Sequence, residues 1–141
     1  MEAKELMIGD WVMVAECVAD AHFRDYPDKI ESIRDGLVGL ESDGLETIIE
    51  RIAPIPLTPE ILKKNGFGYV RNDVNPYDDE VLSHFYLGEE GYCANMDIHI
   101  GTYNKGVFWF SSPLGSLNCI HYIHELQHAL RLCNIEKEIE L

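Results

Sequence analysis

The amino-acid sequence predicts an α+β protein: a small N-terminal β-meander, a short helix, an antiparallel sheet and a long amphipathic C-terminal helix. Two observations predict this class. Apolar runs of strand length, separated by Asp-Gly pairs, fill the first third of the chain. Apolar residues with helical period appear only later, at 59–64 and 119–133. We therefore divide the 141 residues into 1–53 and 54–141, a division that leaves a single compact unit open.

The N-terminal part is expected to be a β-meander, closed as an SH3-like barrel. Residues 7–15, rich in Val and Met and loosely alternating, predict its first strand. A loop is expected at 17–29, with a turn at 27–28. Asp-Gly pairs at 35–36 and 43–44 lie between apolar runs and indicate hairpins. The remaining strands are predicted at 29–34, 36–42 and 45–50.

A short helix is predicted to begin after Thr58 and end at 65–66. Thr58 is a good N-cap, and Pro59 suits the first helical position because its missing N–H has no partner there. Leu57 and Leu62 occupy the two positions of a hydrophobic staple. The Asn-Gly pair at 65–66 supplies the left-handed stop.

Three antiparallel strands are expected next, with turns at 89–91 and 104–106. In the second strand, residues 98 and 100 share one face and His99 lies on the other. The three strands are predicted at 81–88, 95–103 and 106–112.

The long helix is expected to begin at Ser112-Pro113 or Ser116 and to end at Asn134. On a helical wheel its apolar side chains gather on one side and all its histidines on the other. Glu125 stands at the border of the polar side. Residues 135–141 alternate apolar residues with glutamates and are expected to form a solvated strand or tail.

The stretch HELQH at 124–128 fits the H-E-x-x-H pattern of zinc hydrolases. In that pattern two histidines one helical turn apart bind zinc, and the glutamate acts as a base on a metal-bound water. His124 and His128 are the candidate metal ligands and Glu125 the candidate catalytic residue. The alternatives are an ordinary polar helix face, or a weak non-catalytic metal site that includes His121.

A zinc site also needs a third protein ligand. The extended motif H-E-x-x-H-x-x-G-x-x-H fails, because Arg131 and Asn134 stand where it requires glycine and histidine. The chain after the helix is too short for a second packed helix that would supply a glutamate. His99 is the best remaining donor, ahead of His84 and Asp97.

The formal net charge of −14 restricts the class of partner. Phosphate backbones and anionic membrane surfaces repel such a chain, so direct nucleic-acid and membrane binding are disfavoured. The charge is explained most simply by solubility. The more specific alternatives are a basic protein partner and, more weakly, an acidic DNA mimic.

The cysteines and the N-terminus indicate a cytoplasmic protein. None of the four cysteines forms a C-x-x-C pair. Cys119 and Cys133 fall on the apolar side of the predicted helix and are expected to be reduced core residues. The start MEAKELMIGDWV lacks the pattern of a signal peptide, and no apolar run approaches the ~20 residues that span a membrane.

Three blocks, ELMIGDWV, PIPLTPEILKKNGF and YIHELQHALRLCNIEKEIEL, resemble a family of short proteins of gut Bacteroidales and their prophages and mobile elements. The resemblance implies no particular reaction. Its recurring helix element matches His124, Leu126 and Gln127, whereas relatives commonly carry Gln and Asn at the positions of Glu125 and His128. The resemblance therefore implies a structural or docking helix.

Together these features favour a non-enzymatic, cytoplasmic protein-interaction module with an acidic surface. No cofactor is expected for that function, and a homo-oligomer stays open. The alternative from another class is a zinc-dependent hydrolase that uses HELQH, with zinc as its cofactor.

Overall fold

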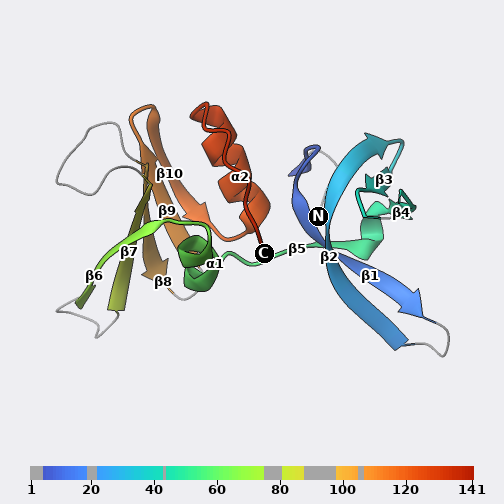
Figure 1. Ribbon diagram of the computed structural model, residues 1–141, viewed down its shortest axis with the longest axis horizontal. Helices are drawn as coiled ribbons and strands as arrows, with labels where there is room; N and C mark the ends of the chain where they lie inside the picture. Colours follow the sequence, from blue (N-terminus) through green and yellow to red (C-terminus); the bar gives the residue numbers. More distant parts are fainter. Residues whose placement is uncertain (1–4, 19–21, 43, 75–80, 88–97, 105–106) are drawn as a thin grey trace. The chain divides into compact units, whose positions relative to one another are not determined.

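The computed structural model describes residues 5–18, 22–42, 44–74, 81–87, 98–104 and 107–141 (Figure 1). These residues form a mixed α+β protein with two antiparallel sheets and two α-helices. The chain divides into a first unit, Met1–Ile55 with Tyr122–His124, and a second unit, Pro56–His121 with Glu125–Leu141. Neither described α-helix has the length and apolar character needed to cross a membrane.

The first unit is a 5-stranded sheet with the strand order β4-β3-β2-β1-β5. β1 and β2 form its long hairpin, and one turn of 3-10 helix, η2, leads from β4 into β5 (Figure 1). The elements are β1 (Trp11–Val18), β2 (His22–Arg34), β3 (Leu37–Leu40), β4 (Glu46–Ile48), η2 (Ile49–Arg51) and β5 (Ile52–Pro54).

The loop expected at 17–29 is wrong, because most of these residues belong to the β1–β2 hairpin. Pro27 and Asp28 suggest a turn, yet both fit into β2. Pro27 is exposed, and its partner in the ladder is Met13 of β1. Asp28 is buried, and its carboxylate accepts hydrogen bonds from the backbone N–H groups of Lys29 at 2.7 Å and Ser42 at 3.3 Å. A buried turn-forming residue is thus satisfied by the neighbouring loop.

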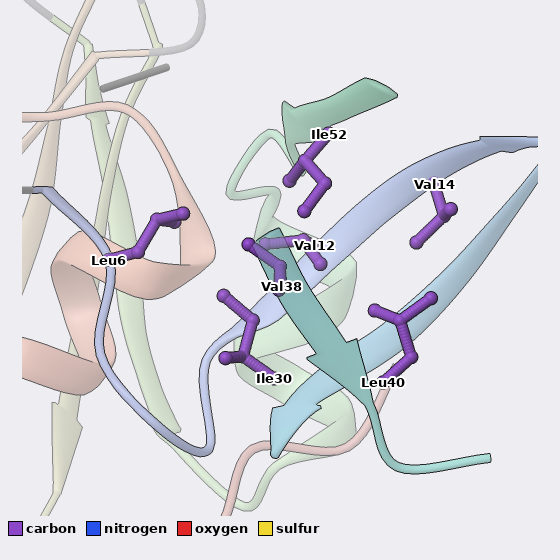
Figure 2. Close-up of a cluster of buried hydrophobic side chains, with 7 residues drawn as sticks. All are labelled: Leu6, Val12, Val14, Ile30, Val38, Leu40 and Ile52. Carbon is purple, nitrogen blue, oxygen red and sulfur yellow. The ribbon is translucent and has the colours of Figure 1, made fainter. Parts of the chain in front are cut away.

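The core of the first unit lies on one face of this sheet (Figure 2). Alternation along β1 buries Val12 and Val14 there, and β3 contributes Val38 and Leu40. Each fully buried aliphatic side chain of this kind stabilises the fold by about 1.5–3 kcal/mol. The cluster is completed by Leu6, Ile30 and Ile52.

The β2–β3 turn confirms the hairpin predicted at the first Asp-Gly pair. Asp35 has φ 50° and Gly36 has φ 82°, as a two-residue turn with two left-handed positions requires. At the second pair Gly44 also has a positive φ of 63°, whereas Asp43 lies outside the described residues.

The second unit is a 5-stranded antiparallel sheet in the order β10-β9-β8-β7-β6, with two helices (Figure 1). β7, β8 and β9 confirm three predicted strands; β6 and β10 were not predicted. The predicted turns fall on residues outside the description, apart from Asn104. The elements are α1 (Pro59–Lys64), β6 (Gly68–Val74), β7 (Val81–Leu87), β8 (Ile98–Asn104), β9 (Val107–Ser112), β10 (Gly115–Ile120) and α2 (Ile123–Leu132).

Helix α1 confirms the predicted boundaries. The Thr58 hydroxyl accepts a hydrogen bond from the Ile61 N–H at 3.3 Å. Gly66, at φ 74°, follows the C-cap, and the Phe67 N–H donates back to the Leu62 carbonyl at 3.1 Å. These bonds form a Schellman motif. Helix α1 is therefore specified almost entirely by its own sequence.

The expectation of a solvated tail after the long helix is wrong, because residues 135–141 are anchored to α1. Ile139 is 1% exposed. The buried Asn65 amide donates to the Glu140 carbonyl and accepts from the Glu140 N–H, each at 2.8 Å. The same amide donates to the Ile61 carbonyl at 2.8 Å. The Asn65 side chain thus makes the two hydrogen bonds to the Glu140 backbone that a neighbouring strand would otherwise make.

Candidate functional site

Helix α2 begins later than expected, because residues 115–120 form β10 instead of its first turns. Ser112 still has a capping role, but in a tight turn between strands. Its hydroxyl accepts from the Leu114 N–H at 3.2 Å and donates to the Gly115 carbonyl at 3.1 Å. Gly115, at φ 146°, occupies a conformation that favours glycine. The β9–β10 hairpin follows from these local features.

Glu125 caps the start of α2. It is the third residue of the helix, and its carboxylate accepts a hydrogen bond from the His121 N–H at 2.7 Å. A carboxylate here satisfies a backbone donor and interacts favourably with the helix dipole. Glu125 therefore has a structural role that requires no metal.

The two histidines of HELQH do not share one environment. His124 is 6% exposed, and its ring is stacked on that of Tyr122 with centroids 5.8 Å apart. His128 is half-buried. The expectation that every histidine avoids the buried side of the helix is thus wrong for His124. A helical wheel assigns each residue to a buried or exposed side from its polarity. It does not predict that a polar ring is buried while stacked on a neighbouring aromatic ring.

His99, the expected third ligand, lies on the far face of the sheet from α2. Ile98 and Ile100, its neighbours in β8, are buried on the other face, where Ile100 is paired with Phe110. Phe110 and Ala129 of α2 line one groove, so α2 rests on that face. The sheet therefore separates His99 from His128.

No group of three or more His, Cys, Asp or Glu side chains within the described ranges could hold a metal ion. The proposed roles of His124, His128 and Glu125 in a zinc hydrolase therefore stay a prediction. The structure supplies no third ligand from His99 for that prediction.

An open groove of about 240 Å³ lies between the β9–β10 hairpin and the last turns of α2. Three of its lining residues are leucines that remain exposed: Leu114 at 76%, Leu117 at 46% and Leu132 at 74%. Buried Phe110 and Ala129 also line it. The groove is thus an apolar recess with an apolar rim.

The position of α2 explains why Leu117 and Leu132 stay exposed. Leu117 is paired with Phe110 and faces the helix side of the sheet, yet Phe110 is buried and Leu117 is not. β10 is the edge strand, so its apolar side extends beyond the cover that α2 provides. Leu132 is the last helical residue, and the chain turns away at Asn134, where φ is 58°.

The sequence alone did not reveal this groove. The long helix was expected to begin at Ser112-Pro113 or Ser116, so Leu114 and Leu117 were not expected in a hairpin. Pro113, which lies between β9 and β10, and Gly115, the first residue of β10, were the available signal, because both favour a turn.

Comparison of the chain with protein-family models, curated proteins and solved structures gives no match.

Proposed function

We propose that the protein is a non-enzymatic interaction module that holds apolar side chains of a protein partner in the groove between the β9–β10 hairpin and α2. The observation that carries this proposal is the exposure of Leu114, Leu117 and Leu132 around one recess. Single exposed leucines are common on protein surfaces, whereas a contiguous apolar patch marks an interaction site.

The size of the groove supports a protein partner over a small-molecule substrate. Its volume of about 240 Å³ is below the roughly 300–1,000 Å³ of typical small-molecule sites. It accommodates one or two apolar side chains, as an anchor pocket at the centre of an interface does.

The charge supports a basic partner over a second copy of the chain. Two copies would each carry a formal net charge of −14 and would repel one another. A partner with Lys and Arg around its apolar anchor is attracted instead, and its association is accelerated at low salt.

The proposal is tested by selecting peptides from a random display library against the protein. We expect the selected peptides to combine a bulky apolar residue with Lys or Arg, and to bind less tightly as salt is raised. The groove variant Leu117→Ser with Leu132→Ser should abolish binding in titration calorimetry. The matched control is Leu45→Ser, which replaces another exposed leucine (62%) in the first unit.

The proposal fails if the groove variant binds the selected peptides as tightly as the parent, or if Leu45→Ser weakens binding equally. It also fails if the parent forms a stable dimer in analytical ultracentrifugation that the groove variant dissociates. In that case the groove is occupied by a second copy.

We further propose that the first unit is an SH3-like barrel. The strand order β4-β3-β2-β1-β5 and the 3-10 turn before β5 support this assignment. A cytoplasmic location remains a proposal, supported by the thiols Cys119 and Cys133, which form no disulfide. Kinship with the Bacteroidales family likewise remains a proposal, carried by the three sequence blocks.

A further inference from the structure

The second sheet has a face that neither described helix covers. α2 lies on the side of Phe110, and Lys63 of α1 lies over the Tyr69 ring, which shares a cross-strand pair with buried Phe85. The opposite face carries half-buried polar and aromatic side chains from three neighbouring strands. They are His84, Tyr86, His99, Trp109 and Ser111.

Two histidines from adjacent strands meet on this face. The Nε2 atom of His84 lies 3.1 Å from the Nδ1 atom of His99, and their ring centroids are 5.1 Å apart. Because His99 pairs with Tyr86 and His84 pairs with Gly101, the two histidines are diagonal neighbours across β7 and β8. Their backbones are therefore held by the sheet ladder and not by a loop.

A neighbouring glycine lets an aromatic ring support this pair. A Cβ atom at Gly101 would overlap the indole of Trp109, so the indole lies flat across β8. The Trp109 ring is 5.4 Å from the His84 ring, at an interplanar angle of 55°. Because the indole packs beside it, the His84 side chain loses few rotamers when it binds a ligand. A site on strands provides this kind of preorganisation.

We propose that His84 and His99 form a two-imidazole site for a first-row transition-metal dication such as Zn²⁺, Ni²⁺ or Cu²⁺. Imidazole nitrogens are preferred ligands of these ions. This site is separate from HELQH and from the leucine-lined groove, since it lies on the other face of the sheet.

The separation of the two nitrogens fits a shared metal. With bonds of about 2.0–2.1 Å, two nitrogens on one ion stand roughly 2.9 Å apart at a right angle and roughly 3.4 Å apart at the tetrahedral angle. The observed 3.1 Å lies between these values. In the metal-free protein the same distance allows one ring N–H to donate to the other ring. Metal binding requires both facing nitrogens to be unprotonated, so the proton of the donating ring moves through water to its other ring nitrogen.

The surroundings of the pair favour a cation. Its described neighbours Tyr86, Gly101, Trp109 and Ser111 carry no positive charge, and the whole chain carries a formal net charge of −14. Both histidines are half-buried. Among the residues that the structure describes, the site has two protein ligands, and water or a ligand from a partner completes the coordination.

The experiment uses Trp109 as its reporter in the full chain, purified without a histidine tag. Trp11→Phe removes the other tryptophan. Ni²⁺ quenches a nearby indole and, unlike Cu²⁺, does not oxidise thiols. We expect saturable quenching by one Ni²⁺ per chain, reversed when Zn²⁺ displaces it. His84→Gln and His99→Gln should each weaken Ni²⁺ binding by more than about tenfold, since even supporting partners of a ligand contribute that much.

The matched control is His128→Gln, which removes a histidine of the helix and should leave Ni²⁺ binding unchanged. Far-UV circular dichroism establishes that each variant is folded. The proposal is overturned if the parent shows no saturable quenching, if His84→Gln and His99→Gln bind as the parent does, or if His128→Gln alone removes binding. A second measurement needs no variant: in ¹⁵N NMR of the parent, Zn²⁺ should shift the imidazole signals of His84 and His99 first. A first shift at any other histidine refutes the site.

Discussion

Single polar side chains hold distant segments of the second unit together. Asn65 bonds both the N–H and the carbonyl of Glu140, and Lys64 donates to the carbonyl of Leu141. Lys137 lies over the Phe67 ring, 5.9 Å from its centroid. The end of the chain is thereby fixed to the end of α1. Buried amides with every group satisfied specify one register, which explains why this segment needs no regular strand.

Glu125 offers a residue-scale prediction that separates its capping role from catalysis. Glu125→Ala removes the acceptor of the His121 N–H and should lower the free energy of unfolding by about 0.3–1.5 kcal/mol. Glu125→Gln should cost less, because an amide oxygen still accepts. Denaturant unfolding monitored by circular dichroism measures both, and the exposed Glu136→Ala is the control.

The parent protein and a His128→Asn variant test the zinc interpretation. A purely structural cap predicts that a chelator leaves the unfolding curve of the parent unchanged and that elemental analysis finds no stoichiometric zinc. Zinc at one per chain, lost in His128→Asn, would instead support the hydrolase. Unchanged stability in Glu125→Ala would contradict the cap.

At this scale the sequence predicts what depends on near neighbours. The roles of Thr58, Pro59 and Gly66 follow from residues within one helical turn, and the structure confirms them. The burial of His124 and the direction of His99 depend on contacts between distant segments, so the sequence alone did not determine them. Strand alternation did predict that His99 lies opposite Ile98 and Ile100, but not which face the helix covers.

The two α-helices end in the same way with different residues. In each, the residue after the C-cap has a positive φ, 74° for Gly66 and 58° for Asn134. After α2, the Ile135 N–H donates to the Leu130 carbonyl at 3.0 Å, which repeats the Schellman bond of α1. The stop at Asn134 was predicted, because asparagine tolerates the left-handed conformation.

This shared motif yields a reciprocal prediction at the scale of the element. Asn134→Gly should stabilise the protein and Gly66→Asn should destabilise it, each by up to about 1 kcal/mol, because glycine adopts a positive φ without the steric cost that other residues incur. No atom lies within 4 Å of a Cβ built at Gly66, so a clash does not confuse the result. Thermal and urea unfolding measure the two changes. Changes of the same sign in both variants would contradict this account.

Element boundaries were predictable where turn chemistry is local. The turn at Asp35-Gly36 and the strands β7, β8 and β9 follow from such signals. The first part of β2 and all of β10 were missed because Pro27 and Ser112 have ordinary turn chemistry in the sequence. Pairing with β1 and β9 decides their conformation, and such pairing is non-local.

At the scale of the whole molecule, the sequence predicted the mixed class and two separate β parts, but not the strands β5, β6 and β10 that complete the two sheets. Five neighbouring strands in each unit follow chain order closely, so each unit is built from contacts between elements near in sequence. The exception is Tyr122 with the first two residues of α2, Ile123 and His124, which belong to the first unit although the rest of α2 belongs to the second. Sequence patterns do not reveal that residues so late in the chain belong to the first unit.

The net charge gives stability and partner binding opposite dependences on salt. Self-repulsion among charges summing to −14 destabilises the compact state, and salt screens it, as the Debye length falls from about 30 Å at 0.01 M to about 8 Å at 0.15 M. The melting temperature should therefore rise over this range, whereas affinity for a basic peptide in the leucine-lined groove should fall.

Replacing the exposed Glu31 and Glu46 by lysine changes the formal charge by two at each position, from −14 to −10, and should weaken both dependences. Differential scanning calorimetry and titration calorimetry in the same buffers measure the pair. A melting temperature that falls with salt would mean that attractive ion pairs outweigh the repulsion. Peptide affinity that does not respond to salt would remove charge as the basis for choosing a partner.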